Sequence, residues 1–135
     1  MKKQWYILTI FLSLCLTSCN PYGEKLEFNG TEVYYTESVV KEEAQKLGNF
    51  LVNSRFADGN RKSVQLTKNE ESGNYIFRMV TNEKAQKEDS YDILFKAISI
   101  QISDSVFNGK AVDFHVCNNT FKTLRVIPFK DDSRK

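Results

Sequence analysis

Two segments of this chain repeat apolar side chains with the period of a helix. Residues 39–53 are predicted to form the first helix, with Ser38 as its N-cap, and its apolar face carries Val40, Ala44, Leu47 and Leu51. The second helix is capped by Asp89 or Ser90, ends at Asn108-Gly109, and carries Tyr91, Phe95, Ile98, Ile102 and Val106. Because each helix is apolar on one side only, each must cover another element.

Three pairs of short, β-rich runs flank these helices. Residues 25–28 and 31–35 are joined by Asn29-Gly30, the dipeptide most typical of a tight hairpin. Residues 63–66 and 75–80 form a second pair around a polar loop, and residues 111–117 and 121–129 form a third. The charged stretch 82–89 is predicted to be a loop.

The order of these elements predicts the fold class. Strand pairs and helices alternate as ββαββαββ, which indicates an α+β fold: one antiparallel sheet of about six strands in three hairpins, with both amphipathic helices on one face. Residues 25–129 are expected to form a single domain, and residues 130–135 a frayed, solvated tail.

A basic start and a short apolar run precede this domain. Met1-Lys2-Lys3 leads into an almost wholly apolar run from Trp5 to Leu16. That run is about a dozen residues, whereas a membrane-spanning helix needs roughly 20. The pattern is typical of a secretory signal peptide, which is predicted over residues 1–18.

Leu16-Thr17-Ser18-Cys19 closes the run and resembles the lipobox of bacterial lipoproteins, in which an aliphatic and two small residues precede an obligatory cysteine. The resemblance implies cleavage between Ser18 and Cys19, lipid on the Cys19 thiol, and a short tether over residues 19–24. It places the protein in the cell envelope, bound to a membrane through its N-terminal lipid. Asn20, where an aspartate would favour the inner membrane, points to the periplasmic side of the outer membrane. The alternative is an ordinary buried cysteine.

Charge and cysteine content exclude some classes of partner and of covalent cross-link. Without Lys2 and Lys3, 17 of the 19 basic side chains remain against 17 acidic ones, so the mature chain is formally neutral. A neutral domain lacks the basic surface that nucleic-acid binding requires, and no nucleic-acid partner is expected. Cys117 is the only thiol left besides Cys19, so the mature chain forms no internal disulfide.

Three stretches, "FNGTEVYYTESV", "YIFRMV" and "VFNGKAVDFHVCNNTFKTLRVI", are similar to an uncharacterised ectodomain module of membrane-anchored bacterial proteins. The resemblance covers most of the mature chain. It supports the fold and implies no activity.

Catalytic candidates are few. His115 and Cys117 lie on one side of one strand, but two ligands fall short of the four of a closed zinc site. Side chains two apart on a strand stand roughly 6.5–7 Å from each other, which is too far for direct proton transfer. The chain has no phosphate-binding glycine loop and no serine-centred elbow. We therefore expect no enzyme, no metal and no cofactor.

The face of the sheet away from the helices is the remaining candidate site. Strand alternation points Phe77, Phe114 and Val126 toward the helices. A solvated face is the plain interpretation, and a recognition surface for an envelope protein or glycan is the alternative. The candidate binding residues are Tyr34, Arg78, His115 and Arg125, and of these Arg78 and Arg125 are expected to be solvent-accessible.

Two functions remain. The first is a membrane-tethered, non-catalytic binding or assembly module of the envelope. The second is a small inhibitor or immunity-type lipoprotein that blocks one toxin or hydrolase.

Overall fold

The computed structural model describes residues 20–129. The predicted signal peptide, the predicted lipidation site Cys19 and the tail 130–135 lie outside this range. The described chain forms six strands, three α-helices and a short 3₁₀ turn, η1 (Asp89–Tyr91). The strands are β1 (Glu24–Phe28), β2 (Thr31–Tyr35), β3 (Lys62–Lys68), β4 (Tyr75–Val80), β5 (Val112–Cys117) and β6 (Thr123–Ile127). The helices are α1 (Lys41–Asn53), α2 (Glu83–Lys87) and α3 (Asp92–Val106).

The α+β class is confirmed, but the purely antiparallel sheet is wrong. The six strands lie in sequence order in one mixed sheet, in which β1–β2, β3–β4 and β5–β6 are antiparallel and β2–β3 and β4–β5 are parallel. A helix that packs on the sheet carries the chain back to the end from which the previous strand started. The next strand therefore runs in the same direction, and each helical crossover creates one parallel pair.

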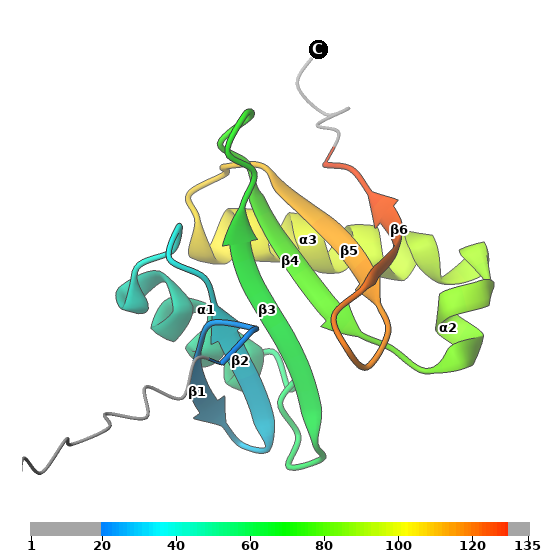
Figure 1. Ribbon diagram of the computed structural model, residues 1–135, viewed down its shortest axis with the longest axis horizontal. Coiled ribbons are helices and arrows are strands. Elements are labelled where there is room, and N and C mark those ends of the chain that lie inside the picture. The colour runs from blue at the N-terminus through cyan, green and yellow to red at the C-terminus, as the bar shows by residue number, and fades with distance from the viewer. Residues whose placement is uncertain (1–19, 130–135) are drawn as a thin grey trace, which may run out of the picture.

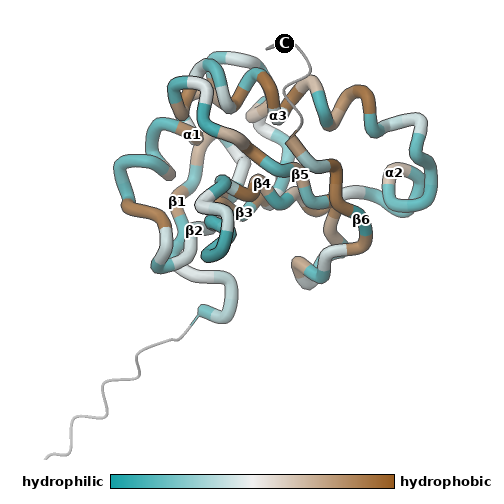
Figure 2. Tube along the Cα trace, turned by 90° about the horizontal axis from the view of Figure 1, so that it is seen from above, coloured by the Kyte–Doolittle hydropathy of each residue, from teal (hydrophilic) through white to brown (hydrophobic). Residues whose placement is uncertain are grey.

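Both long helices cover the same face of the sheet, as predicted. Figure 1 shows α3 behind β4 and β5, and Figure 2 shows α1 and α3 together in one layer above the strands. Between the layers lies one core, in which the fully buried large side chains include Phe77, Phe114, Leu47, Leu66 and Ile102. Stacked rings of Phe95 and Phe114, 4.6 Å apart, join α3 to β5.

The first hairpin forms as its dipeptide predicts. Asn29 and Gly30 both have positive φ, 44° and 83°, as a type I′ turn requires. The end of α3 is also confirmed, since Asn108 and Gly109 adopt positive φ and the Gly109 N–H donates to the Ser103 carbonyl at 2.8 Å.

Both predicted helix caps are wrong. Val40 occupies the N-cap of α1, and its N–H donates to the Glu43 carboxylate at 3.2 Å, while Val40 itself is 58% exposed. The Ser38 hydroxyl instead accepts from the Lys68 N–H at 3.1 Å, which ties the loop to β3. At the other helix, η1 replaces the predicted cap and Tyr91 precedes α3 without a side-chain bond.

The charged stretch after β4 is a helix and not a loop. Asn82 caps α2 by accepting from the Ala85 N–H at 2.9 Å, and Ala85 is buried. Five residues are too few to show a helical period among charged neighbours, so the sequence pattern did not reveal this element.

Candidate functional site on the open face of the sheet

The face of the sheet opposite α1 and α3, called here the open face, carries one row of side chains across all six strands. Strand register places the row in the order Lys25, Tyr34, Gln65, Arg78, His115 and Val126. Three of the predicted binding residues, Tyr34, Arg78 and His115, are therefore brought together. Whether each residue is free to bind a partner depends on the contacts that its side chain already makes.

Arg78 lies at the centre of the open face and is half-buried rather than solvent-accessible as predicted. Its guanidinium donates to the Gln65 side-chain oxygen at 3.1 Å, to the Thr123 hydroxyl at 2.9 Å, and to the Phe121 carbonyl. Arg78 thereby ties β4 to the loop between β5 and β6, and its donors serve the fold.

Three aromatic rings from distant parts of the chain meet over this centre. Tyr22, Tyr34 and Phe121 contact one another edge to face, with centroids 5.0–5.6 Å apart. The Gln65 amide donates to the Tyr22 carbonyl at 2.8 Å, so the residues before β1 are held on the open face. Residues 20–23 of the predicted tether are thus part of the folded surface, and we call them the N-terminal turn.

His115 and Cys117 behave as structural residues. The His115 Nδ1 lies 3.1 Å from the Thr123 hydroxyl, and burial, followed by the nearby Arg78 charge, lowers the pKa of the imidazole. Cys117 is fully buried, and its thiol points to the His115 carbonyl oxygen at 3.6 Å. Neither group is paired with the other as a nucleophile and base.

Arg125 lies on the opposite face from the one predicted. A bulge pairs Cys117 with Thr123 and Val116 with Arg125, which turns Arg125 toward the helix side and leaves Val126 48% exposed on the open face. The Arg125 guanidinium donates to Asp92 at 2.8 and 3.0 Å and to the carbonyls of Gln86 and Ala85 at 2.7 and 3.1 Å. It therefore fastens β6 to the end of α2 and the start of α3.

A carboxylate near the β1–β2 edge is held ionised. Burial raises the pKa of Glu32, but donation from the Tyr34 and Ser63 hydroxyls, with Lys25 and Arg61 nearby, outweighs it and leaves the pKa lowered. The charges of Glu32, Lys25 and Arg61 balance within a local network beside β1 and β2.

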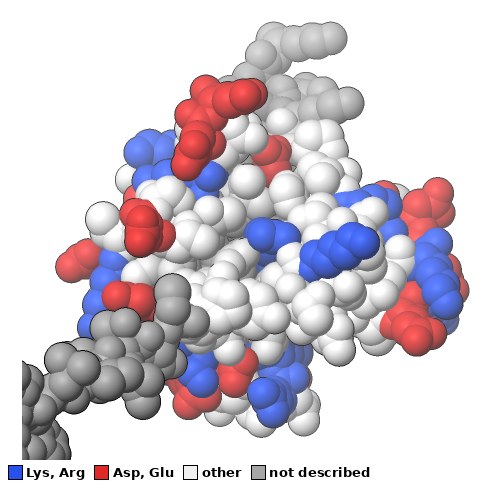
Figure 3. Space-filling view, viewed as in Figure 1, with Lys and Arg blue, Asp and Glu red and all other residues white. Residues whose placement is uncertain are grey.

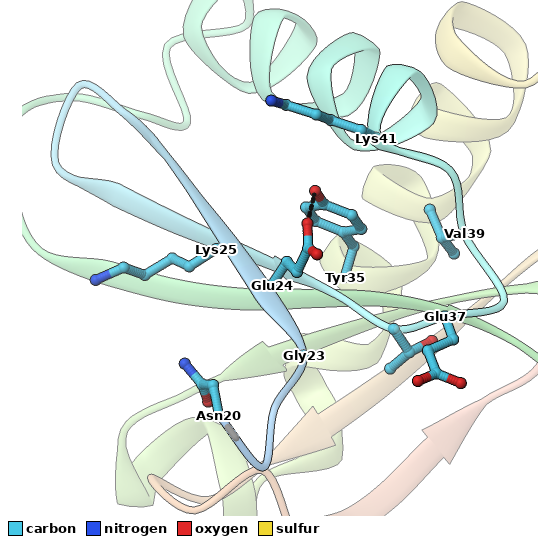
Figure 4. A pocket seen from close by; sticks show the side chains of 9 residues that line it. Asn20, Gly23, Glu24, Lys25, Tyr35, Glu37, Val39 and Lys41 are labelled. Atoms are coloured by element: carbon cyan, nitrogen blue, oxygen red, sulfur yellow. Dashed lines mark hydrogen bonds between the residues drawn. The ribbon is translucent and has the colours of Figure 1, made fainter. Parts of the chain in front are cut away.

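A shallow groove of about 680 Å³ lies along β1 and the loop before α1 (Figure 4). In it the Tyr35 hydroxyl donates to Glu24 at 2.5 Å, and this bond together with burial raises the pKa of Tyr35 to about 12. Lys25, Lys41 and Glu37 also line the groove, so its walls mix both signs of charge and favour no single class of ligand.

The outer side of α3 carries an apolar stripe that the sequence analysis missed. Ile93, Leu94 and Ile100 are 83%, 55% and 40% exposed, and Ala97 lies exposed between them. These four residues, the α3 stripe, recur at helical spacing on the side opposite Phe95. A signal was present in the sequence, because these four residues are apolar although they lie off the predicted apolar face of the helix.

Over residues 20–129, no three His, Cys, Asp or Glu side chains gather closely enough to hold a metal ion. Within the same residues, no helix is both long and apolar enough to cross a bilayer.

Comparison with known families gives one result. Residues 25–127 match the family described as the AF_1994_N family N-terminal domain, and they include β2 to β6, the helices between the strands and all of β1 but its first residue. The chain belongs to this family. The match begins one residue inside β1, so the N-terminal turn lies outside it. Searches of curated proteins and of solved structures found no significant match.

Proposed function

We propose that this protein is a membrane-tethered, non-catalytic lipoprotein of the bacterial cell envelope that acts as a binding or assembly module. The tether rests on the sequence, in which Leu16-Thr17-Ser18-Cys19 follows a basic and apolar leader. The binding role rests on one observation, the exposed α3 stripe. Isolated apolar residues on a surface are ordinary, whereas several exposed apolar residues gathered on one side of a helix are typical of interaction sites.

The geometry of the tether favours a protein as the partner of this stripe. The N-terminal turn lies on the open face, and α3 lies on the other side of the sheet (Figure 2). Lipid on Cys19, the residue bonded to Asn20, is therefore attached on the side of the sheet away from the stripe. The bilayer is then poorly placed to cover the stripe, and the partner we propose is an envelope protein with an apolar surface.

The contacts of the open face support a role without catalysis. Arg78 and His115 are engaged in hydrogen bonds that connect strands and loops, and the Cys117 thiol is buried. A general base or a nucleophile must reach its substrate, and these groups instead hold the β5–β6 loop in place.

A photo-cross-linking amino acid at position 93 in the lipidated protein, in cells of its own host, tests the binding role. The control places the same group at position 40, since Val40 is also an exposed apolar residue, at 58% against 83% for Ile93, and lies outside the stripe. We expect one protein adduct of defined mass from position 93 and none from position 40. The change Ile100→Glu should abolish the adduct without altering the urea midpoint.

Three results would contradict this proposal. Equal adducts from both positions would show that the stripe has no special role. An adduct of twice the mass of the chain would identify a second copy as the occupant, and a lipid adduct would identify the bilayer. The tether is tested separately, because mass spectrometry of the N-terminal peptide must find acyl chains on Cys19 and no residue before it.

A further inference from the structure

The N-terminal turn is a built part of the fold. The Asn20 carbonyl accepts from the Gly23 N–H at 3.1 Å, and the Asn20 side chain accepts from the Tyr22 N–H at the same distance. Gly23 has φ of +94°, and a Cβ there would lie 2.2 Å from the Tyr35 carbonyl oxygen, so only glycine fits this approach to β2. The turn is thus fixed to the sheet by its own backbone.

A fixed turn restricts where acyl chains on Cys19 can lie. Consecutive Cα atoms are 3.8 Å apart, so the Cα of Cys19 is within roughly 11 Å of that of Tyr22 in any conformation. The Tyr22 ring packs on Tyr34 and Phe121 over the centre of the open face. An anchor at Cys19 therefore keeps this face close to the headgroups.

The surface around the anchor suits the boundary between lipid and water. Half-buried Tyr22 and Tyr34 combine a ring with a hydroxyl, and tyrosine is enriched at that depth. On the far strand β6, Val126 lies on the same face and is 48% exposed. Figure 3 shows that basic side chains lie near the middle of this face, while acidic side chains lie mostly toward its edges.

From this geometry we infer that the open face of the sheet rests on the lipid bilayer, with the N-terminal turn, Tyr34 and the β6 strand in contact with the headgroup layer. The inference rests on the proposed lipid anchor, which supplies the affinity, so that the face itself only orients the domain. Two or three acyl chains hold a protein stably on a membrane without further contacts. Because the mature chain is formally neutral, the contact does not depend on anionic lipid.

A pair of fluorescent labels tests this orientation. The lipidated protein carries either Val126→Cys on the open face or Ile93→Cys on α3, both exposed aliphatic positions, and Cys117 is buried and stays unlabelled. Each labelled protein is reconstituted into vesicles of phosphatidylethanolamine and phosphatidylglycerol with brominated acyl chains, which quench nearby fluorophores. We expect loss of fluorescence for the label at position 126, unchanged in high salt, and none for the label at position 93.

The outcomes separate the orientation from the anchor. Equal quenching of both labels, or quenching at position 93 alone, overturns the orientation while the lipoprotein proposal stands. Absence of acyl chains on Cys19 in the native host overturns both. The same labels on a Cys19→Ser chain should show no quenching, and quenching there would mean that the face binds lipid without the anchor, contrary to the orienting role inferred here.

Discussion

Replacing Arg125 with methionine should destabilise this protein although the residue occupies an edge strand. Methionine keeps an apolar stem and removes the guanidinium. The change leaves the Asp92 carboxylate and the carbonyls of Ala85 and Gln86 without their donors. These groups join β6 to two helices, and the side chains of Arg125 and Asp92 are only 23% and 34% exposed.

The size of the effect follows from that partial burial. A hydrogen bond to a charged group contributes about 1.5–3 kcal/mol, and an exposed ion pair contributes about 0–1 kcal/mol. Arg125 makes four bonds of 3.1 Å or less, and water can reach some of the acceptors after its removal. We therefore expect a loss of roughly 2–3 kcal/mol in the free energy of unfolding.

Equilibrium urea unfolding of the mature chain with Cys19→Ser measures this loss. Lys87→Met is the matched control, because Lys87 pairs with Glu83 at 3.6 Å while both side chains are mostly exposed. The control should change stability by less than about 0.5 kcal/mol. If Arg125→Met also stays within that range, then β6 alternates as its sequence pattern suggests, Arg125 points to solvent, and the bulge assigned here is wrong.

Three further predictions concern the core and two ionisable groups. Gly48→Ala should lower the free energy of unfolding by about 1–3 kcal/mol in urea melts, because the new Cβ would lie 2.1 Å from the Phe28 ring. Unchanged stability would mean that the Phe28 ring can move aside without cost. The pKa of Glu43 is lowered from 4.5, since the Tyr75 hydroxyl bond and its other donors outweigh burial, so its stabilisation is present above pH 4.5 and disappears as the pH falls below that value. The stability gap between wild type and Glu43→Gln should therefore narrow in acid, and a constant gap would contradict the shift. The single histidine, His115, should titrate below pH 6.5 by NMR because it is buried, and a value of 6.5 or above would show that burial and the Arg78 charge do not dominate its pKa.

Much of the fold was accessible from local patterns. Residues 31–35 and 75–80 were predicted as strands with the bounds that they have, because β-rich composition and an Asn-Gly turn are local properties. The faces of Ala44, Leu47 and Phe95 were also predicted correctly, since a helix buries the side that is apolar. The helix starts were missed because Glu43 caps α1 from within the helix, while Ser38 bonds to a strand distant in sequence.

The candidate site was predicted only in part. Tyr34 and His115 lie on the open face because the side chains alternate around these two positions of β2 and β5. Alternation placed Arg78 on the correct face but predicted that it would be solvent-accessible, whereas it is half-buried. The β5–β6 loop covers Arg78 because the aromatic contacts of Phe121 hold that loop on the open face. Contacts between segments so far apart in the sequence produce no pattern that can be recognised within either segment.

The amino-acid sequence alone determined which segments become strands and helices, that both long helices share one face, and where a lipid anchor is expected. These properties depend on side-chain periodicity and on short motifs, which act over a few residues. Only the tertiary structure decided the parallel pairing of β2 with β3 and of β4 with β5, the position of Arg125, and the exposure of the α3 stripe. Each of these depends on what lies beside a segment in space, because a bulge is defined by the neighbouring strand and an apolar helix side is exposed only when no other element covers it.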